Sequence, residues 1–218
     1  MTVSTRRERR QQQRRQERRR SGGSGGPSRR VSQMWIVAGV VIAVVALILI
    51  GRAAGVFDPP AVSRTDVSSV DASGPTLGEH KDDLGNEHIA SGQKGSYPSL
   101  PPTSGQHWAQ PAAPAPWGIK TAFLPFEVTT HNLEHGGVVI MYRDLTADEL
   151  DQLRSLVRNL GSSGFSKIIL EPYPDLKDAK VALTAWNWIL KLQSVDDNAV
   201  VKFVRQHYDH EAPEKGVQ

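Results

Sequence analysis

One uninterrupted apolar stretch stands out from an otherwise polar chain. Residues 34–50, MWIVAGVVIAVVALILI, carry no charged side chain, and Gly51 extends the run before Arg52 ends it. A helix rising about 1.5 Å per residue is then at the lower limit for crossing about 30 Å of hydrocarbon. Trp35 stands at the front edge, where its amphipathic ring suits a membrane interface. The pattern predicts one transmembrane helix over residues 34–51.

A cleaved signal peptide is the alternative interpretation of this stretch. Ala53-Ala54-Gly55 would then supply the small residues of a cleavage site. However, more than 30 residues precede the apolar run, and the run exceeds the roughly 7–15 residues of a usual signal-peptide core. We therefore predict an uncleaved anchor.

The second half of the chain shows the hydrophobic spacing of regular elements. Residues 137–142 (GVVIMY) and 167–171 (KIILE) are short apolar runs rich in β-branched side chains, which predicts two buried strands. Residues 147–160 carry apolar side chains at the 3.6-residue spacing of a helix. Thr146 and Glu149 precede and open this helix with the spacing of a capping box.

The last elements are less regular. Residues 181–192 alternate in part, which favours one strand with Trp186 and Trp188 on the same face. A final helix is expected to begin at Asp196 or Asp197 and to run to about residue 207. Together these elements predict an α+β domain with a small, mostly antiparallel sheet and two or three helices.

The remaining segments are polar or rich in proline. Seven prolines lie between Pro98 and Pro125; because proline fixes φ and lacks an N–H donor, this region should consist of ordered loops with short strands. The predicted organisation is a basic disordered cytoplasmic tail (1–33), the transmembrane helix (34–51), a linker (52–75), an extracytoplasmic α+β domain (76–212) and a C-terminal tail (213–218).

Charge divides the chain in the same way. Residues 1–30 hold eleven of the 26 Lys and Arg residues and two of the 23 acidic ones, whereas 15 basic and 21 acidic residues follow from Gly51 onward. Arginine-rich flanks stay in the cytoplasm, so residues after the apolar stretch should face outward. We expect the tail to contact the lipid bilayer and its anionic lipids. Nucleic acid is not an expected partner, because the tail has no aromatic side chains to stack on bases.

Candidate chemistry rests on histidine, since the chain contains no cysteine for disulfides, thiolate ligands or a nucleophile. His131 and His135 stand four residues apart, a spacing that places both on one face of a helical turn beside Glu134. Two imidazoles so placed can grip one metal ion. His107 and His88 are further candidate ligands, and Met141 could add a thioether. This donor set suits copper or zinc.

Two other interpretations of the same residues remain open. Histidines in a loop-rich domain often only donate hydrogen bonds to backbone carbonyls. His131, Glu134 and His135 also fit the H-x-x-E-H pattern of zinc hydrolases, in which the glutamate activates water. That pattern belongs inside a long helix, whereas glycines and a strand follow here, and a third ligand would have to be a distant carboxylate such as Glu211. No catalytic residue other than Glu134 is suggested, which favours binding over catalysis.

Several motifs together resemble the bacterial domain of unknown function 3105 family. They are Pro101-Pro102-Thr103-Ser104-Gly105-x-His107-Trp108, Trp117-Gly118, His131-Asn-Leu-Glu-His-Gly136-x-Val-Val-Ile140 and Leu183-Thr-Ala-Trp186. The resemblance covers roughly residues 76–210. It implies an N-terminal membrane anchor, and it implies no activity.

Three hypotheses of function follow. The first is a single-pass membrane-anchored, extracytoplasmic protein that binds copper or zinc through its histidines. The second is a non-enzymatic cell-envelope interaction module in which the histidines brace the loops, with a protein partner that the sequence does not identify. The third is a metal-dependent hydrolase.

Overall fold

The computed structural model describes residues 29–53, 63 and 65–217. The chain divides into two compact units, Met1–Pro59 and Pro60–Gln218. Most of the predicted basic tail, residues 1–28, lies outside the described residues.

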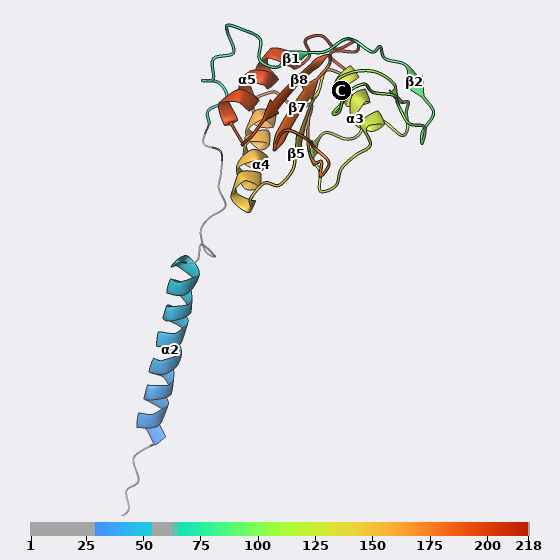
Figure 1. Ribbon diagram of the computed structural model, residues 1–218. Coiled ribbons are helices and arrows are strands. Elements are labelled where there is room, and N and C mark those ends of the chain that lie inside the picture. The colour runs from blue at the N-terminus through green and yellow to red at the C-terminus, as the bar shows by residue number, and fades with distance from the viewer. Residues whose placement is uncertain (1–28, 54–62, 64, 218) are drawn as a thin grey trace, which may run out of the picture. The chain divides into compact units, whose positions relative to one another are not determined.

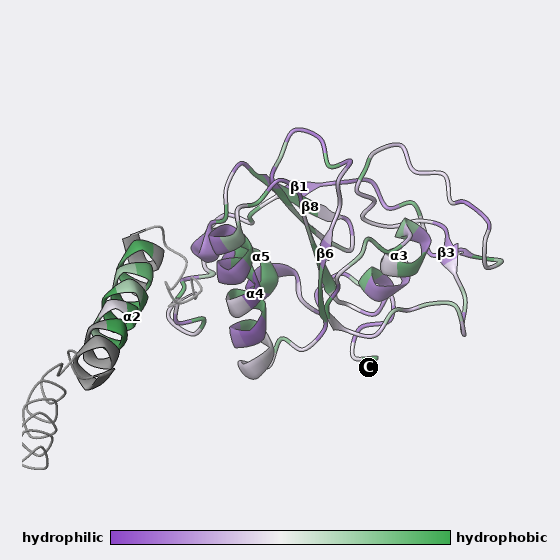
Figure 2. Ribbon diagram, turned by 90° about the horizontal axis from the view of Figure 1, so that it is seen from below, coloured by the Kyte–Doolittle hydropathy of each residue, from purple (hydrophilic) through white to green (hydrophobic). Residues whose placement is uncertain are grey.

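The first unit contains the helix α2 (Arg29–Ala53), which includes the apolar stretch. The coloured part of α2 is almost wholly hydrophobic, whereas α4 and α5 carry both colours, as amphipathic helices do (Figure 2). Over the residues that the structure describes, no helix is found that is both long and apolar enough to span a membrane. The transmembrane prediction therefore has no support from the structure.

The second unit is built around a six-stranded sheet (Figure 1). Its strands, in order across the sheet, are β1 (Glu79–His80), β8 (Trp188–Leu192), β7 (Val181–Ala185), β5 (Val138–Tyr142), β6 (Ile168–Pro172) and β4 (Gly118–Ile119). The pairings β1·β8, β8·β7 and β7·β5 are antiparallel, and β5·β6 and β6·β4 are parallel. The prediction of an α+β domain with a mostly antiparallel sheet is confirmed.

Helices cover both faces of this sheet. α4 (Ala147–Ser162) and α5 (Asp197–His207) pack on one face, where alternate strand residues such as Ile140 and Leu170 meet Leu156 and Phe203. The intervening strand residues, such as Val139 and Ile169, point to the other face, where α3 (Phe126–Glu134) contributes Leu133. Figure 1 shows α4 and α5 on the side of the sheet opposite α3. This alternation follows from the two-residue period of a strand.

The predicted α4 forms with its expected N-terminal cap. The Thr146 hydroxyl accepts the Glu149 N–H at 3.2 Å, and the Glu149 carboxylate accepts the Thr146 N–H at 2.8 Å. Because each side chain satisfies a backbone donor that the first helical turn leaves free, the two residues fix where the helix begins. α4 joins β5 to β6, which lie parallel because the helix carries the chain back across the sheet.

The single strand predicted over residues 181–192 is wrong. The segment forms a hairpin of β7 and β8, in which Ala185 pairs with Trp188. Asn187 in its turn has φ of 63°, which asparagine tolerates better than most residues. The turn places Trp186 in the cluster on the α3 face, whereas Trp188 packs against the cluster on the opposite face. The two tryptophans therefore do not share one face.

Segments predicted as a linker and a tail pack against this domain. In the predicted linker, Val67 is buried in the core, and the Arg205 guanidinium donates to the carbonyls of Val67, Ser68 and Val70. At the other end, the Glu214 N–H donates to the Glu134 carbonyl at 3.0 Å. The C-terminal segment thus lies against the end of α3.

Candidate metal centre

Three histidines and one glutamate meet beside α3. His88 stands on β2 (His88–Ile89) and His107 on β3 (His107–Trp108), two short parallel strands that pair these histidines with each other. α3 supplies His131 and Glu134, three residues apart and hence on the same side of the helix. One donor atom from each of the four residues lies within 4.8 Å of the others. The cluster could therefore hold one metal ion.

The three imidazoles converge on one carboxylate oxygen of Glu134. Oε2 of Glu134 lies 2.9 Å from Nε2 of His107 and 3.8 Å from Nε2 of both His88 and His131. Glu134 and His107 are fully buried and His131 is 5% exposed, whereas the His88 side chain is 45% exposed. The cluster is thus a buried site with one ligand at the surface.

Backbone carbonyls orient two of the three imidazoles. Nδ1 of His107 lies 2.8 Å from the Gly105 carbonyl oxygen, and Nδ1 of His131 lies 2.6 Å from the Trp108 carbonyl oxygen. A carbonyl only accepts hydrogen bonds, so the proton of each neutral ring is assigned to Nδ1. Each Nε2 then presents a lone pair toward Glu134. Histidine ligands of metal ions commonly have this arrangement.

Those lone pairs and the Glu134 carboxylate concentrate negative charge at the centre of the cluster, and no described lysine or arginine balances it. With His107 neutral, its Nε2 and Oε2 of Glu134 would face each other as two acceptors. A single proton on Nε2 of His107 would satisfy that contact only. Burial, the largest cause, lowers the pKa of His131, although the hydrogen bond to the Trp108 carbonyl opposes this effect. A divalent cation would satisfy all the converging lone pairs at once.

Surrounding residues hold Glu134 and the turn at Gly105 in place. The Asn86 side-chain amide donates to Oε1 of Glu134 at 2.8 Å. Gly105 has φ of 112°, and an added Cβ would lie 3.2 Å from the Cβ of Leu84. A larger residue would therefore strain the turn that brings the Gly105 carbonyl to His107.

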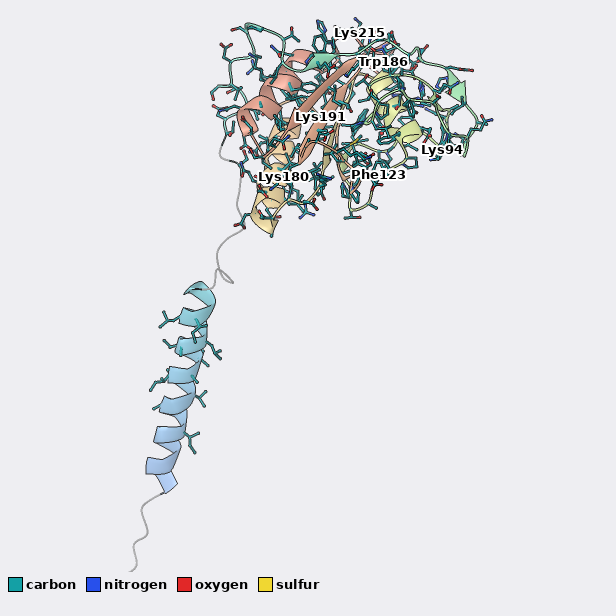
Figure 3. The ribbon with its side chains drawn as sticks, in the orientation of Figure 1. Lys94, Phe123, Lys180, Trp186, Lys191 and Lys215 are labelled. Carbon is teal, nitrogen blue, oxygen red and sulfur yellow. The ribbon has the colours of Figure 1, made fainter. Side chains whose placement is uncertain are left out.

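α3 also fixes the proline-rich loops around the site. Asn132 is fully buried; its side-chain oxygen accepts the Ala115 N–H at 2.9 Å, and its amide donates to the Ala115 carbonyl at 2.8 Å. Glu127 is also buried and accepts the Gly95 N–H at 3.0 Å. Lys94 and Phe123, labelled in Figure 3, belong to loops on this side of the domain and line a groove with Glu127. These contacts make α3 the support of the site.

The structure places His135 outside the group formed by His88, His107, His131 and Glu134. His135 caps the C-terminus of α3, and its Nε2 lies 3.2 Å from Oε2 of Glu214. His131 and His135, which were expected to bind one ion together, therefore belong to different groups of candidate ligands. Within its group, Nε2 of His131 lies 3.8 Å from Oε2 of Glu134. Met141 lies in the apolar cluster with Leu133.

Glu211, the distant carboxylate considered as a third ligand, lies outside both groups of candidate ligands. Its Oε2 lies 3.5 Å from Nε2 of His80. Sequence reasoning missed Asn86 and Glu214. Asn86 stands two residues before His88, which is the only signal for it, and Glu214 lies in a segment without periodicity.

The fold and the cluster define an α+β domain with a buried His/Glu site that could hold a metal. The chain belongs to the family described as "Protein of unknown function (DUF3105)", whose family model matches residues 88–218. The resemblance seen in the sequence is thereby confirmed. The match begins at His88 and includes all four residues of the cluster. Comparisons with curated proteins and with solved structures give no match.

Proposed function

We propose that this protein binds one divalent transition metal ion, zinc or copper, through His88, His107, His131 and Glu134. The observation that carries the proposal is the approach of three imidazole Nε2 atoms to one carboxylate oxygen at 2.9–3.8 Å. The carbonyl partners of His107 and His131 support it, because they leave the Nε2 lone pairs free for a ligand.

The donor set favours binding over hydrolysis. Four protein donors fill a tetrahedral shell, whereas a catalytic zinc keeps one position for water. In the hydrolase interpretation Glu134 would stand beside the metal and activate that water. Here Glu134 lies among the histidine nitrogens, and Asn86 holds its second oxygen. α3 also ends at Glu134, so His135 does not take the position of the second histidine in the hydrolase pattern.

The donor chemistry limits the choice of metal. Three imidazoles and one carboxylate, with no thiolate, suit zinc, and copper(II) forms the stronger complexes with most nitrogen and oxygen sites. His88 is the only half-exposed member of the cluster. A surface ligand gives the ion a route to solvent. This arrangement is more typical of a protein that takes up and releases metal than of a protein that holds metal permanently.

Titration of the purified full-length chain tests the proposal. After treatment with a chelator, the chain should bind at least one zinc or copper(II) ion with a dissociation constant below micromolar, measured by competition with a chromophoric chelator. Bound metal should also raise the unfolding temperature, because it binds the folded state preferentially. A chain that binds neither ion at micromolar concentrations would contradict the proposal and favour the structural-brace alternative.

Membrane attachment is a separate proposal, and it rests on the sequence alone. We propose that residues 34–51 anchor the chain, with the arginine-rich tail inside the cell and the domain outside. A reporter enzyme that is active only outside the cytoplasm, fused after Gln218, should be active, and the same reporter placed at residue 1 should not. Activity in the reverse pattern, or recovery of the chain in the soluble fraction, would refute this proposal.

A further inference from the structure

A second group of ligand-type side chains lies next to the proposed site. It consists of Glu134, His135 and Glu214, with one donor atom from each within 4.8 Å of the others. Nε2 of His135 lies 3.2 Å from Oε2 of Glu214. Glu134 belongs to both groups, and the rings of His131 and His135 lie 4.7 Å apart. The two groups are therefore adjacent along the end of α3.

The C-terminal segment, residues 209–216, packs closely against the end of α3. The Asp209 N–H donates to the Gly136 carbonyl at 2.9 Å, and the Asp209 carboxylate accepts the Gly216 N–H at 3.1 Å. A Cβ on Gly136, whose φ is 84°, would overlap the Asp209 side chain. Together with the backbone hydrogen bond between Glu214 and Glu134, these contacts place the Glu214 carboxylate beside His135.

In the part of the chain that the structure describes, no lysine or arginine balances the charges of this second group. Among the described residues, Glu134 and Glu214 form ion pairs with histidines only. The nearby Lys167 ammonium is engaged by Asp209 and by the His135 carbonyl, the latter at 2.7 Å. The His135 side chain is 4% exposed, so its Nε2 is held beside Glu214 in a largely buried position.

We infer that His135 and Glu214 bind a second divalent metal ion, with Glu134 as a carboxylate bridge to the first. The inference rests on the proposed function, because it shares Glu134 with the first site. A carboxylate oxygen has two lone-pair sites, so Oε1 of Glu134 can accept from Asn86 and still contact an ion. Three protein donors leave one position for water, and Glu214 is 48% exposed. The second ion is therefore held more weakly than the first.

The number of zinc ions per chain tests the inference. Equilibrium dialysis of the full-length chain against zinc alone should give two ions at saturation, one tight and one weaker. Glu214→Gln should weaken the second ion by about tenfold or more and leave the tight ion unchanged. Glu211→Gln is the matched control, because it removes a partly exposed carboxylate of the same segment that lies outside the second group.

The outcomes separate the two proposals. A chain that binds one tight zinc ion, with or without Glu214→Gln, would overturn the inference and leave the proposed function intact. Loss of both ions in Glu214→Gln, with unfolding unchanged, would show one shared site and would also overturn it. A chain that binds no zinc would overturn the inference, and a chain that binds neither zinc nor copper(II) would overturn both proposals.

Discussion

His107→Ala is expected to weaken zinc or copper binding by on the order of 100-fold, equivalent to about 3 kcal/mol. His107 is fully buried and makes the shortest of the three histidine contacts to Glu134, at 2.9 Å. Its Nδ1 is fixed by the Gly105 carbonyl, so its Nε2 is oriented before any ion arrives. Removing it takes away one of four donors and leaves Glu134 without its closest histidine. The measurement is a competition titration against a chelator of known affinity.

Two other histidines give this experiment its controls. His210 has a side chain 66% exposed and belongs to neither ligand group, so His210→Ala should bind metal as the unchanged chain does. The metal affinity of His88→Ala should lie between those of His107→Ala and His210→Ala, because water can replace an exposed ligand. If His107 only braces the loops, His107→Ala will lower the free energy of unfolding without metal and leave the affinity of the chain for metal unchanged.

Local spacing was enough to predict β5, β6 and α4 in the second half of the chain. The apolar runs of β5 and β6 and the helical spacing of α4 each lie within one continuous segment, so neighbouring residues carry the whole signal. The capping box of Thr146 and Glu149 is confirmed for the same reason. The hairpin at residues 181–192 was missed because Trp186 and Asn187 in its turn are not the usual glycine-containing turn pair.

The candidate metal centre could be predicted only in part. Four of the five candidate ligands meet in one cluster, and His135 belongs to the adjacent group. His88 and His107 come together through two-residue strands separated by a long loop, and no periodicity marks such strands. α3 was not predicted as a nine-residue helix, because Thr129, Thr130 and Asn132 are poor helix formers in isolation. Burial and the Asn132 contacts to Ala115 stabilise it in the folded domain.

Glu171 is the one described acidic group whose pKa is raised far above its usual range. It is fully buried on β6, and burial raises its pKa from 4.5 to about 7, although the Leu124 N–H and Lys120 oppose this effect. Oε2 accepts the Leu124 N–H at 2.9 Å, whereas Oε1 has no partner. The folded state therefore binds the Glu171 proton more tightly than the unfolded state does.

Glu171→Gln should consequently change how the stability of the domain depends on pH. Because the folded-state pKa is the higher one, the contribution of Glu171 is fully present below about pH 4.5 and is lost as pH rises through about 7. A shift of this size corresponds to about 3 kcal/mol. Glutamine does not titrate, so the free energy of unfolding of the variant, relative to that of the unchanged chain, should rise by about that amount between pH 4 and pH 8.5.

Denaturant unfolding at several pH values measures this difference directly. The comparison between the two proteins cancels the contributions of other groups, including those of His131 and His207, whose pKa values burial lowers and which therefore cost stability as pH falls. Glu79→Gln, at a carboxylate 68% exposed, is the control and should show no such rise. A difference between Glu171→Gln and the unchanged chain that stays constant with pH would mean that the Glu171 carboxylate is stabilised inside the domain by contacts stronger than those of Leu124 and Lys120.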